Sequence, residues 1–199
     1  MVDRSGPGPL FFFGAMSPYS WFAAERIERL LPDAQWRGVL AGVVFKAHDR
    51  VSWGLTDQRA DGIADCEARA ATHGLGPMHW PDPWPTSDLA AARGMIYAET
   101  RGLLKEFSLS AMRLAFLEGC DLEQHETVLE AGRRVGIAPG ELTAALEDPT
   151  VKDGLRAVND QALALGVFGV PTVAVGPELF WGDDRLDEAA AAHRPELAG

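Results

Sequence analysis

The chain alternates between short apolar runs of strand length and longer segments with apolar residues at helical spacing. Near the N-terminus, the aromatic run Leu10–Phe13 predicts a buried strand that ends near Gly14. Ser17 then stands at the position of a helix N-cap, and Pro18 stands at the first helical position, where its missing N–H is tolerated. Helical spacing continues to residue 31, so this stretch predicts a strand that leads directly into a capped helix.

A second strand is predicted directly after that helix. Residues 34–45 form an apolar stretch rich in β-branched residues. A strand, a crossover helix and a second strand of these lengths form a right-handed unit with parallel strands. Lys46 would follow the second strand at its carboxyl end, the edge where open α/β sheets bind ligands, although most lysines at such positions are solvated.

The middle of the chain has the pattern of helices alone. Apolar residues recur at helical intervals in residues 57–73, 87–104, 108–119, 123–135 and 139–146. Residues 75–85 contain too many prolines and aromatic residues for regular structure and predict a packed loop. The apolar stripe of each helix is typical of a core face, so these segments predict one all-helical block.

Strand patterns return after a further helix predicted over residues 150–165. Pro171 begins a β-branched run that ends at residue 175, and proline is tolerated at the first position of a strand. A Gly-Pro pair at 176 and 177 then turns the chain, and residues 178–181 return beside the strand. This part of the chain therefore predicts a helix followed by a β-hairpin.

Asp183 and Asp184 precede a final amphipathic helix over residues 185–192. Capping of that helix explains the two carboxylates as well as ligand binding does. The complete order is βαβ, then helices, then αββα. It predicts an α/β domain split into residues 8–50 and 154–199, interrupted by an all-helical insertion over residues 51–153.

Composition restricts the classes of function. The 199 residues are 47% hydrophobic, which is typical of a globular chain, and no apolar run reaches the length of a membrane helix. The net charge of −11 argues against nucleic-acid binding, because phosphate contacts need clustered Lys and Arg. Residues 1–9 lack the features of a signal peptide and read as a flexible leader, so we expect a cytoplasmic protein that binds neither nucleic acid nor a membrane.

Cysteine and histidine spacing argues against redox pairs and metal sites. Cys66 and Cys120 stand 54 positions apart and form no C-x-x-C pair, so the default expectation is two buried thiols. The five histidines are scattered, without the spacing of metal ligands, and we expect no metal.

The start of the first helix can stabilise an anion. First-turn N–H groups lack partners, and the helix dipole places partial positive charge there. Keeping a thiol mostly ionised at pH 7 requires its pKa to fall by about one to two units, or roughly 1.4–2.7 kcal/mol. A charge-assisted hydrogen bond from a hydroxyl contributes about 1.5–3 kcal/mol and the dipole about 0.3–1 kcal/mol. Ser17 and the helix together therefore suffice, although a Ser-Pro N-cap alone is usually structural.

The element order and two motifs resemble the thioredoxin-like fold in its DsbA-type form. In that fold a redox C-P-x-C begins the first helix, and the matching residues here are Ser17-Pro18-Tyr19-Ser20. The motif Gly-Val-Pro-Thr precedes the hairpin, and in this family the proline that matches Pro171 is cis. Because serine cannot replace an attacking thiolate, the motif nearly excludes a disulfide oxidoreductase.

More closely, the stretches SPYSWFA, GVFGVPT and ELFWGDDRLDE, together with FK at Phe45-Lys46, resemble 2-hydroxychromene-2-carboxylate isomerases and the related kappa-class glutathione transferases. The resemblance implies glutathione, or another low-molecular-weight thiol, as cofactor. It implies that Ser17 contacts the thiol sulfur, that the Val170 backbone pairs with the cysteinyl part beside Pro171, and that Asp183 and Asp184 hold the γ-glutamyl end. It also implies a homodimer.

The leading hypothesis is therefore a glutathione-dependent isomerase acting on an aromatic, carboxylate-bearing small molecule. The thiolate held by Ser17 would add to a conjugated carbon, permit rotation and leave unchanged. Candidates for an aromatic-lined substrate pocket, with Lys46, are Tyr19, Trp21, Trp53 and Trp84. Two alternatives stay open: a kappa-like glutathione transferase, which consumes the thiol, and a redox-inactive thioredoxin-like binding module.

Overall fold

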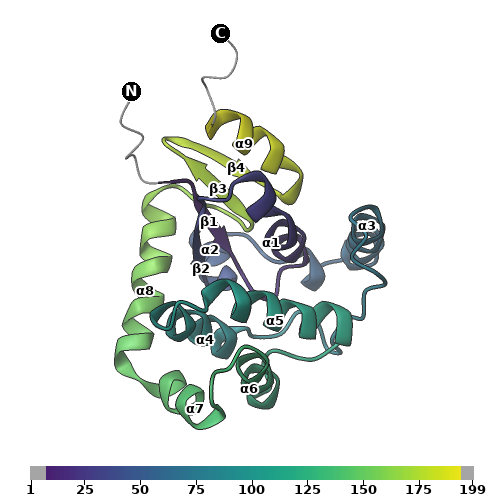
Figure 1. Cartoon of the computed structure of the whole chain (residues 1–199). Coiled ribbons are helices and arrows are strands. Elements are labelled where there is room, and N and C mark those ends of the chain that lie inside the picture. The colour runs from purple at the N-terminus through teal and green to yellow at the C-terminus, as the bar shows by residue number, and fades with distance from the viewer. Residues whose placement is uncertain (1–7, 194–199) are drawn as a thin grey trace.

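The computed structural model describes residues 8–193, and in that range a single mixed sheet forms the centre of the molecule (Figure 1). Its strands are β1 (Leu10–Phe13), β2 (Gln35–Gly38), β3 (Thr172–Val175) and β4 (Glu178–Trp181). The strand order is β2-β1-β3-β4. β1 is parallel to β2 and antiparallel to β3, and β3 is antiparallel to β4. The sheet thus joins segments from both ends of the chain, as the thioredoxin-like prediction requires.

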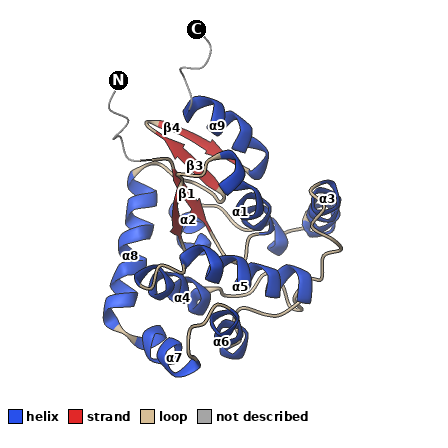
Figure 2. Cartoon of the chain, in the orientation of Figure 1, coloured by secondary structure: helices blue, strands red, loops and turns tan. Residues whose placement is uncertain are grey.

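Helices surround the sheet and fill the segment between its two halves (Figure 2). The α-helices are α1 (Pro18–Leu30), α2 (Ala41–Ala47), α3 (Arg59–Thr72), α4 (Leu89–Thr100), α5 (Leu104–Glu118), α6 (His125–Arg134), α7 (Pro139–Glu147), α8 (Pro149–Ala164) and α9 (Leu186–His193). Short 3₁₀ turns are η1 (Trp53–Leu55) and η2 (Asp183–Arg185). The predicted helices and hairpin are all present, most with ends shifted by one to four residues.

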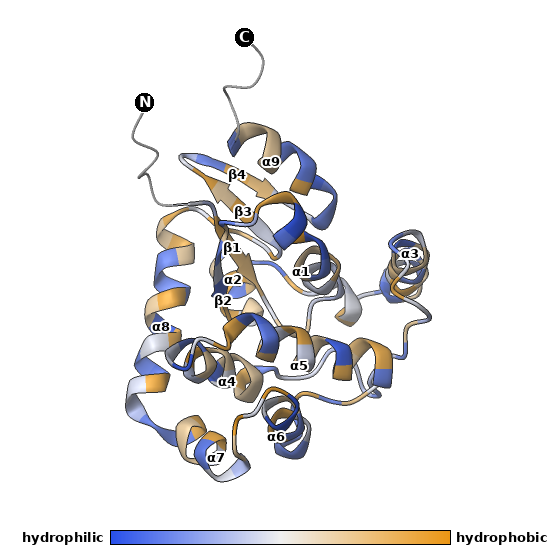
Figure 3. Cartoon of the chain, in the orientation of Figure 1, coloured by the Kyte–Doolittle hydropathy of each residue, from blue (hydrophilic) through white to orange (hydrophobic). Residues whose placement is uncertain are grey.

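The two faces of the sheet pack against different helices because side chains alternate along each strand. Phe11 and Phe13 point to the main core, which α1, α4, α5 and α9 share. Their rings are 5.0 Å apart, and each meets the edge of Trp36. Phe12 points the other way, into a smaller cluster with Val44 of α2 and residues of α8. Figure 3 shows β1 and β3 in the orange of apolar residues, whereas the helices alternate between orange and blue along their length.

The second strand is shorter than predicted. Only Gln35–Gly38 pair as a strand, and Ala41–Ala47 form α2. A short apolar run does not distinguish a strand from a buried helical turn, and here the contact with α8 decides. The Leu40 N–H donates to Asn159 of α8, and Val44 packs into the same cluster. Lys46 therefore lies in the last turn of a helix and not at the end of a strand.

The predicted all-helical block is correct for α4 to α7, which lie together below the sheet in Figure 1. α3 stands apart from that block and packs on α1 and η1. The main core runs without a break from α1 to α7, so the proposed boundaries at residues 51 and 153 remain a prediction. The loop at residues 75–85 is irregular as predicted, with cis bonds before Pro83 and Pro85.

Two expectations concern the ends of the chain and membranes. Residues 1–7 of the predicted leader lie outside the described range. Among residues 8–193, every helix falls short of the length and hydrophobicity that crossing a bilayer demands.

Candidate functional site

A cavity of about 1130 Å³ opens where the β1–α1 turn meets the start of β3. The turn contributes Met16 and Ser17, and the cis bond between Val170 and Pro171 faces it from the β3 side. The remaining walls come from α2 with the segment up to residue 58, from Arg69 of α3, from the 84–88 loop, and from residues 181–184. Most residues that the sequence singled out are therefore brought together in one place.

Ser17 caps α1 as predicted. Its Oγ accepts the N–H of Ser20 at 3.2 Å, and this bond leaves the hydroxyl proton free to be donated. Pro18 has no N–H, and the Trp21 N–H is bonded to the Ser17 carbonyl. Within residues 8–193 the N–H of Tyr19 has no partner, so it is the first-turn amide available to a ligand. An anion at this position would meet one hydroxyl, one amide and the helix dipole.

The main chain at Val170 forms the opposite edge of the site. Val170 is 5% exposed and lies in the cavity wall. Its amide and carbonyl have no hydrogen-bond partner within residues 8–193, whereas the next carbonyl, of Pro171, accepts the Gly182 N–H at 3.0 Å. This edge is thus open for backbone pairing, and Gly182 connects it to the turn that carries the two aspartates.

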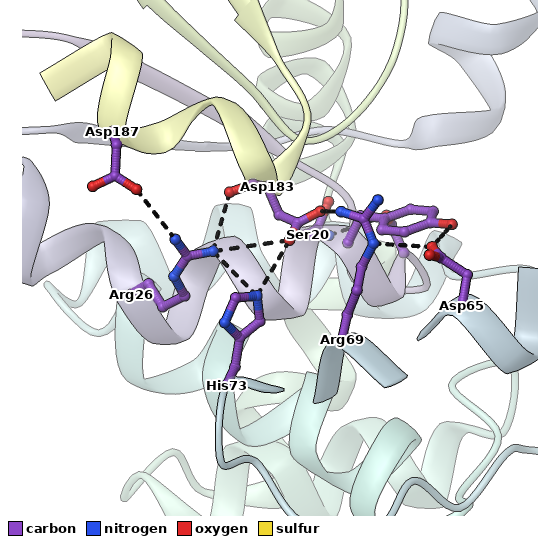
Figure 4. A network of polar contacts seen from close by, with 9 residues as sticks. Ser20, Arg26, Asp65, Arg69, His73, Asp183 and Asp187 are labelled. Atoms are coloured by element: carbon purple, nitrogen blue, oxygen red, sulfur yellow. Dashed lines mark hydrogen bonds and ion pairs between the residues drawn. The ribbon is translucent and has the colours of Figure 1, made fainter. Parts of the chain in front are cut away.

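Asp183 is the centre of an ion network (Figure 4). Its carboxylate is 2% exposed and accepts a 2.9 Å bond from Arg69 of α3. His73 lies 3.6 Å away and Arg26 of α1 3.9 Å away, and Arg26 also donates to the Asp183 carbonyl. Burial outweighs these cations and raises the carboxyl pKa. Asp183 therefore ties η2 to α1 and α3, and its carboxylate is already occupied.

Asp184 differs from its neighbour in every one of these respects. It is exposed and lies at the cavity edge, and it forms no ion pair among residues 8–193. Gly182 makes this arrangement possible, because its φ is +120° and a Cβ there would lie 2.3 Å from the Asp184 carboxylate. Arg69 also lines the cavity, and its Nη2 has no partner among the described residues, while Nε and Nη1 bind Asp65 and Asp183.

Aromatic side chains form the wall opposite Ser17. Trp53 and Trp84 line the cavity with ring centroids 4.9 Å apart. Tyr19 extends this surface, since its ring lies 6.3 Å from that of Trp53. Its hydroxyl donates to Asp65 and burial raises its pKa, so the Tyr19 phenol is engaged and remains protonated.

Comparison with known proteins identifies the family of this fold. The model of the DsbA-like thioredoxin domain family matches residues 10–193. The chain belongs to this family. A 2-hydroxychromene-2-carboxylate isomerase of Sphingobium xenophagum is 29% identical, over 89% of this chain and 93% of its own.

Solved DsbA-like structures share the fold. A 2-hydroxychromene-2-carboxylate isomerase superimposes with a TM-score of 0.80 at 21% identity, covering 92% of this chain and 93% of its own. The cytosolic disulfide reductase DsbM of Pseudomonas aeruginosa, solved with GSH, has a TM-score of 0.62 at 12% identity, covering 93% and 95%.

Within this DsbA-like fold, the prediction that Trp21 lines the pocket is wrong. Trp21 is fully buried, stacks on Phe116 at 5.8 Å and donates its indole N–H to Glu25. It points to the core because it lies on the α1 face that packs against α5. Lys46, by contrast, lines the cavity and is exposed, although its helix was predicted as a strand.

Two residues of the wall were not predicted. Arg50 lines the cavity and donates a hydrogen bond to the Phe168 carbonyl. Its guanidinium lies 4.7 Å from the centre of the Trp181 ring. Asp88 is 5% exposed and accepts the Met16 N–H at 3.2 Å. Nothing near either residue in the sequence signals this placement, because both contacts span more than 70 positions. The thiol of Cys66, buried behind Tyr19, has its pKa raised by burial to about 12, which excludes it as a nucleophile.

Proposed function

We propose that this chain is a glutathione-dependent isomerase of the 2-hydroxychromene-2-carboxylate isomerase type. The observation that carries the proposal is the donor pair at the start of α1, the Ser17 hydroxyl and the free Tyr19 amide, facing the open Val170 backbone across one cavity. A cysteinyl thiol peptide fits between a thiolate-binding helix start and a backbone edge. The 29% identity with a curated isomerase favours the same assignment.

The thiol peptide would lie along the sheet side of the cavity. Its sulfur binds the Ser17 hydroxyl and its cysteinyl backbone pairs with Val170. Because the Asp183 carboxylate is occupied by Arg69, the amino group of the γ-glutamyl end binds Asp184. The Arg69 Nη2 is the matching donor for the α-carboxylate of that end.

The aromatic substrate would lie between the thiol and the tryptophan wall. Trp53, backed by the buried ring of Trp84, offers apolar surface to an aromatic ring, and Lys46 and Arg50 offer positive charge to its carboxylate. The thiolate then adds to a conjugated carbon, the adjacent bond becomes single and rotates, and elimination returns the thiolate. The amide and hydroxyl at the helix start stabilise the departing sulfur anion.

Glutathione titration by calorimetry, together with a spectrophotometric isomerisation assay, tests the proposal. We expect saturable binding, and isomerisation that requires glutathione without consuming it. Ser17→Gly should reduce kcat while keeping most of the helix capping. Asp148→Gly is the matched control, because Asp148 caps α8 outside the cavity by accepting the Thr150 N–H.

Each failure points to a different class of protein. Glutathione consumption with formation of a conjugate would assign a transferase instead. Binding of thiol peptides without turnover of any aromatic carboxylate would assign a binding module. Absence of thiol binding would refute the proposal outright.

A further inference from the structure

Asp88 is a buried carboxyl group in the cavity wall, without an ionic partner. It immediately precedes α4, is 5% exposed and lines the same cavity as Ser17. No charged side chain among residues 8–193 contributes to the shift of its pKa. A carboxylate buried away from cations is costly and needs an explanation beyond packing.

Helix capping does not explain the orientation of this side chain. Asp is a favoured N-cap residue, yet the Asp88 carboxyl makes no capping bond to α4. The Leu89 N–H is instead bonded to the Ser87 hydroxyl. The Asp88 Oδ2 accepts the N–H of Met16, the residue before Ser17. The carboxyl group is therefore directed at the turn that carries the thiol-binding serine.

The surroundings of Asp88 suit proton transfer near neutral pH. Burial raises its pKa to about 6, while the bonds from the Met16 and Asp88 amides act in the opposite direction. A group with a pKa near the working pH is both a competent acceptor and a competent donor of a proton. The other ionisable groups of the wall are Tyr19, Lys46, Asp49, Arg50, Arg69, Asp183 and Asp184. The Tyr19 hydroxyl donates to Asp65, and Asp183 is bound by Arg69, so neither is free to carry a proton through the cycle.

We infer that Asp88 is the proton-transfer group of this cavity, and this inference rests on the proposed thiol-dependent isomerisation. The Asp88 carboxylate accepts the proton of the thiol, and the thiolate that forms, held by Ser17 and the start of α1, then bonds to the conjugated carbon. The electron pair of the broken double bond moves to the conjugated oxygen of the substrate, and Asp88 gives that oxygen the proton. After rotation the proton returns to Asp88, the electron pair on the oxygen re-forms the double bond, and the C–S bond breaks with its pair going to the sulfur. The thiolate then takes the proton back from Asp88, which restores the carboxylate and the thiol. No proton, electron or thiol is consumed.

Asp88→Asn tests this role, because the amide oxygen can still accept the Met16 N–H. In the wild type, kcat/KM should fall as pH decreases through about 6, since protonated Asp88 cannot accept the thiol proton. In the variant this acid limb should disappear and kcat should fall by about 10²- to 10⁴-fold, the usual contribution of a general acid–base group. Glutathione Kd should change by less than about twofold. Asp148→Asn, a carboxylate outside the cavity that also accepts a backbone N–H, should keep the wild-type profile.

Difference infrared spectroscopy gives a readout independent of turnover. The carbonyl band of a protonated buried carboxyl should titrate near pH 6 in the wild type and vanish in Asp88→Asn. Asp88→Ser, which also retains an acceptor oxygen, replaces the amide variant if that one does not fold. Normal kcat with an unchanged acid limb, or a persistent infrared band, would overturn the role of Asp88. A wild type that neither binds glutathione nor isomerises would instead overturn the proposed function.

Discussion

Replacement of each of the two neighbouring aspartates in the 182–185 turn by asparagine should change a different property: stability at Asp183 and thiol binding at Asp184. Asp183→Asn removes a charge-assisted bond of 2.9 Å to Arg69, which contributes about 1.5–3 kcal/mol. It also removes two longer pairs to His73 and Arg26, each about 0.2–1 kcal/mol. The amide keeps one acceptor oxygen, and Arg69 is 33% exposed and can be hydrated. The loss of stability should therefore lie in the lower part of the range that these contributions give together. We expect a loss of about 2–3 kcal/mol, or a fall in Tm of about 4–12 °C for a chain of this size.

Asp184→Asn should leave the melting temperature nearly unchanged, because Asp184 is exposed and forms no ion pair within residues 8–193. Its effect should appear in binding, where loss of a contact of about 1.4 kcal/mol raises the glutathione Kd about tenfold. Calorimetry with a glutathione analogue that lacks the amino group checks the contact, since Asp184→Asn should weaken that analogue no further. An Asp183→Asn variant that melts with the wild type, or an Asp184→Asn variant that binds normally, would refute the division of roles between them.

Three further predictions concern the start of α1 and the buried carboxyl group. Ser17→Gly and Ser17→Ala should both raise the thiol pKa of bound glutathione by about one to two units. Thiolate absorbance followed against pH measures this change. If the pKa stays unchanged and only the stability of Ser17→Ala falls, Ser17 acts as a helix cap and nothing more. The protein should not accelerate the reduction of insulin by dithiothreitol, because serine occupies both ends of the S-P-Y-S turn. Acceleration by a variant that lacks Cys66 and Cys120 would place a disulfide activity outside this turn and contradict the prediction. Asp88 has a pKa of about 6 when folded and about 3.9 when unfolded, so its stabilising proton is fully present below pH 4 and lost as pH rises through 6. Asp88→Asn should therefore match the wild type in thermal unfolding at pH 4 and exceed it by about 3 kcal/mol at pH 8, and an equal difference at both values would contradict the pKa.

Local signals in the sequence were sufficient for the side of the cavity that Ser17 and Val170 form. The Ser17-Pro18 cap and the Gly-Val-Pro-Thr motif each fix their own backbone, so their geometry could be predicted without knowledge of the rest of the chain. Residues 41–47 were mistaken for a strand because their conformation is set by contact with α8. The roles within the aspartate pair were equally hidden, since Arg69, which binds one of them, is 114 positions away.

The aromatic side of the cavity could be predicted only in part for the same reason. Trp53 and Trp84 were identified by residue type, which does not distinguish a wall tryptophan from a core tryptophan such as Trp21. Asp88 reads as an ordinary helix cap in the sequence, and its bond to Met16 spans 72 positions. Positions that depend on such distant contacts require the folded chain.

The cavity takes its two sides from separate stretches of the chain, and this division allows one wall to be exchanged while the other stays unchanged. Ser17 and Val170 belong to the parts that form the sheet, whereas Trp53, Trp84 and Asp88 all lie between them in the sequence. A chimera that receives only residues 51–58 and 84–88 from a relative would acquire a foreign aromatic wall and keep its own Ser17, Arg69 and Val170. The aromatic wall can therefore change without any alteration at the start of α1 or at Val170.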